Sequence, residues 1–311
     1  MGITAQGLDF LLAARHEGVA FDRTLTIGRQ FLLVPPDRLA EMLAPLSAED
    51  LLAPPEEPSF AEALLRRLGA DEVCSIDGSD YEGATFVHDL NRPLPSSFDR
   101  RFTVVLDGGC LEHIFDFATA IRNCMQLVEV GGHLLCMAPV SNAAGHGFYQ
   151  FSPELYFRVL SPDNGFEVER MLLAEVRPGA TWYEVADPAD AGRRIEFTTR
   201  HPAYLYVQAR RVDDRPPLRS PPVQSDYDQR WKQDQSESTV QSPPPPQGAV
   251  ARLGASLKEA GRRHPSIIVP VRLTRRALAW QHRRRHPYDP TLFAPLGRRL
   301  SGSEGGRTPW R

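Results

Sequence analysis

Cysteine is scarce in this sequence, and its four copies follow no metal-binding or disulfide pattern. Cys74, Cys110, Cys124 and Cys136 are widely spaced in a chain of 311 residues, and no two of them form a CxxC pair. Three of them fall inside or at the end of apolar segments, where a thiol behaves as a small apolar group. The spacing excludes a disulfide scaffold and a zinc finger and indicates a reducing compartment. We therefore expect no metal site.

Long apolar runs are also missing. No stretch approaches 18 consecutive apolar residues, so we expect no membrane-spanning helix. The first 15 residues contain neither a basic leader nor the apolar core of a secretion signal. We therefore expect a cytoplasmic protein. No internal repeat is present.

Proline, in contrast, is abundant. The sequence has 28 prolines and a hydrophobic content of only 41%, which favours one folded domain together with a poorly ordered portion. Proline, serine and glutamine concentrate in residues 213–250. Such a segment buries too little apolar surface to offset the entropy lost on ordering, so we predict a disordered linker there.

Charge is divided unevenly along the chain. The net charge is -3, yet from Arg252 onward 14 basic residues face only three acidic ones. Residues 251–311 are therefore predicted to be a basic tail, partly helical over 271–285, attached to an acidic body. We expect this tail to contact either an anionic membrane or the acidic body of the same protein. Charge without a known binding module makes nucleic acid an unfavoured partner.

The most informative segment predicts a strand, a helix and a second strand. Residues 104–106 are an apolar run that ends in Asp107-Gly108-Gly109, a turn that lets the backbone approach a neighbour closely. A helical pattern follows over 117–128, then Gly131-Gly132 and a second apolar run at 134–138. In doubly wound sheets ligands bind outside the carboxyl ends of such strands.

The rest of the first 212 residues supplies the other elements of an α/β sheet. Further strands are expected at 24–27, 73–76, 84–87, 165–173 and 203–209. Helices are expected at 7–17, 37–43, 59–68 and 152–160. In the last two strands, apolar and polar residues alternate, as in strands with one buried and one exposed face. These two strands are predicted to form an antiparallel hairpin. We therefore predict an α/β fold over 1–212, with a doubly wound, seven-stranded, mostly parallel sheet.

The order and chemistry of these segments resemble a class I S-adenosylmethionine-dependent methyltransferase domain. The resemblance is carried by Leu111-Glu112-His113 after the fourth strand and by Gly131-Gly132 before the fifth. Residues 145–154, Gly-His-Gly-Phe-Tyr-Gln-Phe-Ser-Pro-Glu, further resemble a bacterial group of methyltransferase-like proteins associated with surface-glycan genes. The likeness is closest over 73–166 and does not include the tail. It implies a Rossmann-like fold and S-adenosylmethionine as cofactor.

The resemblance also implies cofactor-binding residues at the ends of the strands. Asp77, followed by Gly78, is expected to accept the ribose hydroxyls, and Asp89 stands where the family has an aspartate near adenine. Asp107 and Gly108 are expected beside the methionine portion. Asp77 and Asp89 equally fit ordinary strand-end turns, so both interpretations stay open for them.

The first loop departs from the family pattern. The family has an acidic residue and two or three glycines after the first strand, whereas this chain has only Gly28, followed by Arg29 and Gln30. Gly28 is expected to let the cofactor approach, and Arg29 or Gln30 to bind its carboxylate. The alternative is a cofactor-free relative that keeps the sheet as a binding or scaffold module in surface-glycan biosynthesis. Side chains such as Arg29 or Phe31 filling the cofactor space would favour this alternative.

Two histidines are candidates for a general base. His113 and His146 each follow one of the two central strands, and we predict that they share a cleft with Asp107 and Gly108. Glu112 is expected to cap the following helix or to hold His113. The alternatives are a buried structural histidine and an aromatic plug that seals the end of the sheet. The expected substrate-binding residues, which would wall the cleft, are Phe148, Tyr149 and Gln150.

Together these features predict an S-adenosylmethionine-dependent methyltransferase. The acceptor is expected to be an oxygen or nitrogen of a small-molecule or sugar-like compound, with a histidine taking its proton.

Overall fold

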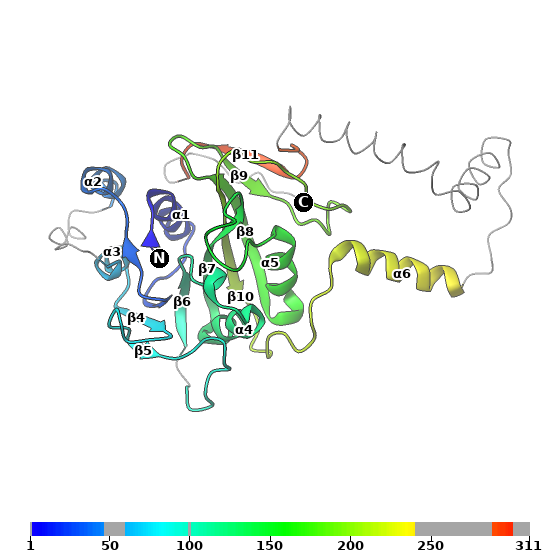
Figure 1. Ribbon diagram of the computed structural model, residues 1–311, viewed down its shortest axis with the longest axis horizontal. Coiled ribbons are helices and arrows are strands. Elements are labelled where there is room, and N and C mark those ends of the chain that lie inside the picture. Colours follow the sequence, from blue (N-terminus) through cyan, green and yellow to red (C-terminus); the bar gives the residue numbers. More distant parts are fainter. Residues whose placement is uncertain (1, 47–59, 99–100, 240–287, 301–311) are drawn as a thin grey trace.

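A single mixed sheet forms the centre of the molecule (Figure 1). The computed structural model describes residues 2–46, 60–98, 101–239 and 288–300. Nine strands pair in the order β11-β9-β8-β10-β7-β6-β2-β4-β5. The five from β7 to β5 run parallel, and β10 runs antiparallel to both β7 and β8.

The parallel strands are β2 (Arg23–Ile27), β4 (Glu72–Asp77), β5 (Phe86–Val87), β6 (Phe102–Asp107) and β7 (Val128–Ser141). The other strands of this sheet are β8 (Phe166–Glu175), β9 (Trp182–Val185), β10 (Ala203–Arg211) and β11 (Phe293–Gly297). A separate two-stranded parallel sheet consists of β1 (Gly2–Ile3) and β3 (Phe31–Leu32).

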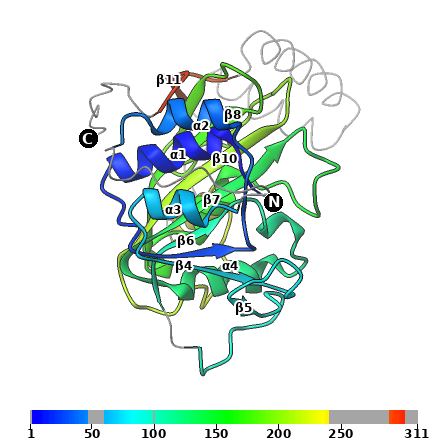
Figure 2. The ribbon, with the colours of Figure 1, turned by 90° about the vertical axis from the view of Figure 1, so that its left-hand side faces the viewer.

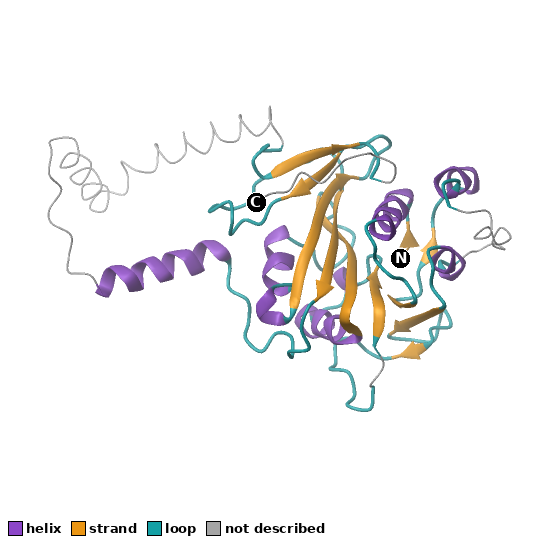
Figure 3. Ribbon diagram, turned by 180° about the vertical axis from the view of Figure 1, so that it is seen from behind, coloured by secondary structure: helices purple, strands orange, loops and turns teal. Residues whose placement is uncertain are grey.

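Helices cover both faces of the sheet (Figures 2 and 3). On one face lie α1 (Ala5–His16), α2 (Pro36–Leu43) and α3 (Glu62–Arg67). On the other lie α4 (Phe117–Leu127) and α5 (Pro153–Val159). Short 3-10 helices span Leu111–His113 and Pro162–Asn164. Among the helices of the described segments, none is long and apolar enough to cross a membrane.

The central strands are apolar on both sides because each side meets a helical layer. Val105 packs into the core beneath α4 and α5, whereas Val104 and Leu106 pack into the core beneath α1, α2 and α3. All three are fully buried. This two-sided burial explains the near-continuous apolar run that the sequence shows at this strand.

The strand β7 begins earlier than the sequence predicts. The helical pattern was expected to continue to residue 128, yet α4 ends at Leu127 and β7 already starts at Val128. The strand therefore includes Gly131 and Gly132. A Cβ on Gly132 would lie 2.7 Å from the Thr103 carbonyl oxygen, so glycine is needed for β7 to approach β6. Gly132 is thus a close strand contact, whereas Gly131, with φ of 90° and open space around it, lies where the register of the pair shifts between Val128 and His133.

The expected seven strands are all present, but the sheet has two more. Strand β9 pairs with β8, and β11 pairs with β9 at the sheet's edge. The prediction of seven strands is therefore wrong. Its cause is long-range pairing, because β11 comes from residues 293–297, which the sequence assigns by charge to the tail.

Part of the predicted linker is helical. Residues 225–239 form α6 (Ser225–Thr239), which extends away from the sheet in Figure 1. Its first residue is tied to the body, since Ser225 donates its N–H and its hydroxyl to Glu154. Within the helix, Lys232 pairs with Asp228 at 2.6 Å. The prediction of a linker without structure is therefore wrong for residues 225–239, while the expected helix over 271–285 lies outside the described residues.

Candidate functional site

The carboxyl ends of β2, β4 and β6 meet at one edge of the sheet, as the sequence predicts for a ligand site. Strand β2 lies between the other two, and Ile27, Ile76 and Asp107 end up in neighbouring positions. Gly28 follows with φ of 69°, a conformation that favours glycine, and its N–H donates to the Ile76 carbonyl.

Gln30 occupies the space that Gly108 leaves open at this edge. A Cβ built on Gly108 would lie only 2.4 Å from Gln30 Oε1, so the glutamine amide lies directly against the glycine. Gln30 is 1% exposed. Its Nε2 donates to the Ile27 carbonyl at 2.7 Å, whereas Oε1 has no hydrogen-bond partner. The sequence predicts Gln30 at the sheet edge, as a candidate ligand of the cofactor's carboxylate, but it does not predict the contact between Gln30 and Gly108.

Arg29 is committed to protein partners. Its Nε donates to Glu62 at 2.6 Å and Nη1 donates to the Glu82 carbonyl at 2.7 Å, while the guanidinium lies 3.8 Å from the centre of the Phe60 ring. Phe31 stacks on the same ring. Arg29 thus joins α3 to the loop after β4.

The predicted ribose and adenine residues lie farther along the same edge. Asp77 ends β4 and is partly exposed, and Gly78 follows it in open space. Asp89 is exposed and accepts from the N–H and the side-chain amide of Asn91. These bonds hold the pKa of Asp89 below its usual range. Asp89 therefore stabilises the turn after β5, and its place beside adenine stays a prediction.

Asp107 is fully buried at the end of β6. Its Oδ1 accepts from the N–H groups of Cys110 and Leu111, whereas Oδ2 has no partner. Burial raises the pKa of Asp107 to about 6, against the lowering effect of these hydrogen bonds. Asp107 shapes the Gly108-Gly109 turn from beneath.

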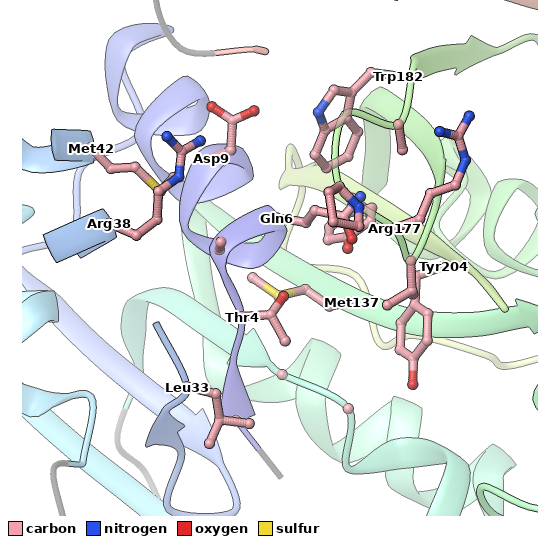
Figure 4. A pocket seen from close by; sticks show the side chains of 18 of the residues that line it. Thr4, Gln6, Asp9, Leu33, Arg38, Met42, Met137, Arg177, Trp182 and Tyr204 are labelled. Atoms are coloured by element: carbon pink, nitrogen blue, oxygen red, sulfur yellow. The ribbon is translucent and has the colours of Figure 1, made fainter. Parts of the chain in front are cut away.

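A cavity of about 820 Å³ opens beside this turn, between α1 and the strands β7 and β10 (Figure 4). Gly108 and Gly109 border it, and so do His113 and His146. Its other walls include Thr4, Gln6, Met137, Arg177, Trp182 and Tyr204. The predicted cleft therefore exists for Gly108 and both histidines, while Asp107 lies beneath its surface.

Glu112, His113 and His146 form a cluster in which the two histidines line the cavity and Glu112 lies buried behind them. One ligand atom from each lies within 4.8 Å of the other two, and His146 Nε2 is 3.3 Å from Glu112 Oε1. The Glu112 side chain is fully buried, whereas that of His146 is 47% exposed. Neither carboxyl oxygen of Glu112 has a hydrogen-bond partner. Glu112 therefore contacts His146 without a well-aligned hydrogen bond.

The electrostatics of this group follow from burial. Desolvation and the nearby Asp107 carboxylate raise the pKa of Glu112 to about 8. Burial and the neighbouring His146 lower the pKa of His113. Each shift favours the uncharged form of its group, because no opposite charge nearby offsets the cost of burying the charged form.

The loop after β7 is built to bring His146 over Glu112. The N–H groups of Phe148 and Tyr149 donate to the Glu112 carbonyl at 2.8 and 3.3 Å. A Cβ on Gly147 would lie 2.8 Å from that carbonyl, so the loop can pack this closely only with glycine. The Gln150 side chain closes the loop by accepting from the Ala143 N–H.

The predicted substrate-binding residues face away from the cavity. Phe148 is 66% exposed and packs edge-on against Phe115, and Tyr149 donates its hydroxyl to the Phe115 carbonyl. Tyr149 also stacks on Phe151. His146 thus faces the cavity, whereas Phe148 and Tyr149 pack against Phe115 and Phe117 at the start of α4.

Several cavity residues escape sequence reasoning. Trp182 and Tyr204 come from β9 and β10, and Thr4 and Gln6 come from the start of α1. The sequence pattern gives no functional signal at these positions. They reach the cavity only through the pairing of β10 with β7 and through the position of α1 above the sheet.

No family model matches the sequence, and no curated protein matches it. Solved structures with some likeness include TehB from Haemophilus influenzae, with 14% identity and a TM-score of 0.34, covering 65% of this chain and 61% of that chain. This chain thus spans less than two thirds of TehB.

A second similar structure is the 1,6-didemethyltoxoflavin-N1-methyltransferase of Burkholderia thailandensis, with bound S-adenosylhomocysteine. It has 13% identity and a TM-score of 0.29, covering 67% of this chain and 79% of that chain. An S-adenosylmethionine-dependent methyltransferase from Clostridium acetobutylicum has 11% identity and a TM-score of 0.25, covering 66% and 73%. With TM-scores below 0.5, these likenesses carry no conclusion about the site or activity of this chain.

Proposed function

We propose that this protein is an S-adenosylmethionine-dependent methyltransferase whose acceptor binds in the cavity beside Gly108 and Gly109. One observation carries the proposal. The glycine turn at the end of β6 borders the cavity on one side and, on the other, the sheet edge formed by the carboxyl ends of β2, β4 and β6. A reactive group held at that edge would meet an acceptor in the cavity across a backbone that has no side chains.

The residues at this edge suit the cationic cofactor. Asp77 is available for the ribose hydroxyls, and two buried acceptors without partners, Gln30 Oε1 and Asp107 Oδ2, flank Gly108. An ammonium group would supply the hydrogen bonds that these acceptors lack. When bound, the cofactor supplies an electrophilic methyl group.

The cavity suits a small acceptor with an apolar part. Met137 and Trp182 are 5% and 1% exposed and give the cavity an apolar wall, while Arg38 and Arg177 line its border. His113 and His146 face the same space and are positioned to take a proton from an oxygen or nitrogen of the acceptor. A sugar-like acceptor of surface-glycan biosynthesis in the cytoplasm fits this combination.

A second candidate function is favoured by the packing of Gln30. Because Gln30 fills the space against Gly108, the sheet edge is also suited to a cofactor-free relative that uses only the cavity, as a binding or scaffold protein. In the methyltransferase, Gln30 would contact the bound cofactor. In the cofactor-free binding protein, Gln30 would occupy the space in which the cofactor would otherwise bind.

Isothermal titration with S-adenosylmethionine and S-adenosylhomocysteine tests the proposal. We expect binding below millimolar concentration, weakened at least about 10-fold by Asp77→Ala because a carboxylate to hydroxyl bond is lost. Asp80→Ala, an exposed change in the same turn, is the matched control and should bind like the wild type.

Gln30→Ala separates the two candidates. If Gln30 Oε1 accepts from the cofactor, this variant binds more weakly than the wild type. No binding to the wild type at millimolar cofactor overturns the enzyme proposal, and binding gained only in Gln30→Ala identifies Gln30 as a plug.

A further inference from the structure

The Glu112, His113 and His146 cluster combines two imidazoles that line the cavity with one carboxylate buried directly behind them. We propose that these three side chains bind a divalent transition-metal ion, with Zn²⁺ as the reference ion. The donor set is that of sites in which two histidines and one carboxylate hold a metal and leave a position open for a ligand. This inference does not depend on methyl transfer. With the ion bound, His113 and His146 would act as its ligands and not as the groups that take a proton, because an imidazole nitrogen that coordinates a metal ion cannot also accept a proton.

The distances suit a metal ion after small side-chain movements. Two ligands of a tetrahedral Zn²⁺ lie about 3.3 Å apart when each is about 2.0–2.1 Å from the ion. His146 Nε2 and Glu112 Oε1 are already 3.3 Å apart, and the three ligand atoms lie within 4.8 Å of one another. The two histidine rings are 5.2 Å apart between centres. Both histidines are exposed to the cavity and have room to turn toward a shared ion.

The buried carboxylate is the second, independent observation. Glu112 has no exposed side-chain surface, and both of its carboxyl oxygens lack hydrogen-bond partners. Burying a carboxyl group whose oxygens take part in no hydrogen bond is costly, and the contact with His146 at 3.3 Å is not a well-aligned hydrogen bond. A cation would satisfy this carboxyl group. A Cβ on Gly109 would lie 3.2 Å from Oε1, so the glycine keeps side-chain atoms away from this oxygen, and a small movement of the side chain would bring Oε1 to the cavity.

The backbone holds the three ligands in a fixed relation. Glu112 and His113 are neighbours in one 3-10 helix, and the Glu112 carbonyl accepts two N–H groups from the loop that carries His146. This loop returns to the sheet where the Phe151 N–H donates to the Pro139 carbonyl at 2.7 Å. The loop is therefore anchored on both sides of the cluster, which lowers the entropy lost when an ion binds.

The chemistry of the donors selects the class of ion. Imidazole nitrogen favours transition metals such as Zn²⁺ and Co²⁺, whereas Mg²⁺ prefers oxygen ligands. The open side of the ion would face the cavity, where a hydroxyl or carboxylate oxygen of a cavity ligand can bind it.

Titration of the untagged, metal-stripped full chain with Zn²⁺ tests the site, and the visible absorption of added Co²⁺ reports on its ligands. We expect one ion per chain with low-micromolar or tighter affinity and no comparable binding of Mg²⁺. His113→Gln and His146→Gln should each weaken Zn²⁺ binding at least about 10-fold, because each removes one of three ligands. Their folding is checked by circular dichroism.

Two controls keep the test specific. His133→Gln alters another histidine–carboxylate pair, in which His133 Nε2 lies 3.1 Å from Glu169, and should leave Zn²⁺ affinity unchanged. Gly147→Ala keeps all three ligands but displaces their loop and should weaken binding, whereas Gly145→Ala, with open space around its Cβ, should not.

The proposal is overturned if the wild type binds Zn²⁺ no better than both histidine variants, or if His133→Gln abolishes binding as they do. Because this titration contains no S-adenosylmethionine, its failure is distinct from failure of the proposed methyltransferase function.

Discussion

At the scale of single residues, the site differs from an ordinary protein core in its buried polar atoms without partners. Gln30 Oε1, Asp107 Oδ2 and both oxygens of Glu112 lie within or next to the carboxyl ends of β2 and β6. Each such atom costs about 1–3 kcal/mol in a folded protein. Proteins tolerate this cost mainly where function requires it, so these four unpaired oxygen atoms indicate that a ligand binds at this edge of the sheet.

Asp107→Asn should stabilise the protein at neutral pH and much less in acid. The folded state holds the Asp107 proton more tightly, with a pKa of about 6 against 3.8 for an unperturbed carboxyl. Wild-type stability therefore falls as the pH rises from about 4 to about 6 and stays reduced above that range. Asparagine keeps the Oδ1 acceptor and cannot ionise. The gain over the wild type should grow by about 2–3 kcal/mol between pH 4 and pH 7.5.

Urea unfolding at both pH values, in buffer with a chelator, measures this gain. The control is Asp89→Asn, because Asp89 is exposed and its pKa is lowered rather than raised. A difference between Asp107→Asn and the wild type that stays constant with pH would contradict the account of a buried, costly charge.

At the scale of secondary-structure elements, the end of α4 depends on an arginine from a distant strand. Arg211 in β10 is 4% exposed and donates to the Val128 carbonyl at 2.6 Å and to the Met125 carbonyl at 3.4 Å. The last carbonyls of a helix have no partner within the helix, so this side chain supplies what the local sequence lacks. The same guanidinium pairs with Asp214.

Replacing Arg211 by methionine should destabilise the protein by about 2–4 kcal/mol, because it leaves buried carbonyls without donors. The neighbouring Arg210→Met serves as the matched control. Arg210 pairs with Glu169 at an exposed site, with 46% of its own side chain accessible, so its loss should cost less than about 1 kcal/mol. Equal losses of thermal stability in the two variants would refute the capping role.

The sequence predicts helices and strands better than it predicts which of them pack against one another. Helix α5 begins where the Ser152 and Pro153 pattern places it, and the Ser152 hydroxyl accepts from the Leu155 N–H. His113 and His146 come together because both follow adjacent parallel strands, which the strand order alone implies. Gln30 against Gly108 and Trp182 at the cavity depend on packing between distant segments, and no local pattern encodes such contacts.

At the scale of the whole molecule, the basic C-terminal region contributes to the fold. Phe293 in β11 is 1% exposed and contacts Phe197 and Tyr288. The Leu300 N–H donates to Asp9 in α1 at 2.9 Å, and Arg299 pairs with Glu41. Residues 288–300 therefore pack on the acidic body, across the domain boundary that composition indicates at residue 212.

Phe293→Ala should destabilise the whole protein by about 3–4 kcal/mol, the usual cost of removing a buried phenylalanine. Pro295→Ala in the same strand changes an exposed residue and should cost less than about 1 kcal/mol. Urea unfolding followed by tryptophan fluorescence measures both, since Trp182 lies in the adjacent strand β9. Unfolding of Phe293→Ala at the wild-type urea concentration would mean that β11 adds nothing to stability.

The cavity walls combine the first and last described segments, with Gly2 and Thr4 on one side and Arg298 and Arg299 on another. During synthesis on the ribosome, the sheet strands up to β10 emerge long before Arg298, so the nascent chain lacks part of the cavity wall until Arg298 and Arg299 have emerged. Any ligand of the cavity then acts as a late folding partner. Its binding energy stabilises only those chains in which both of these segments have packed at the cavity.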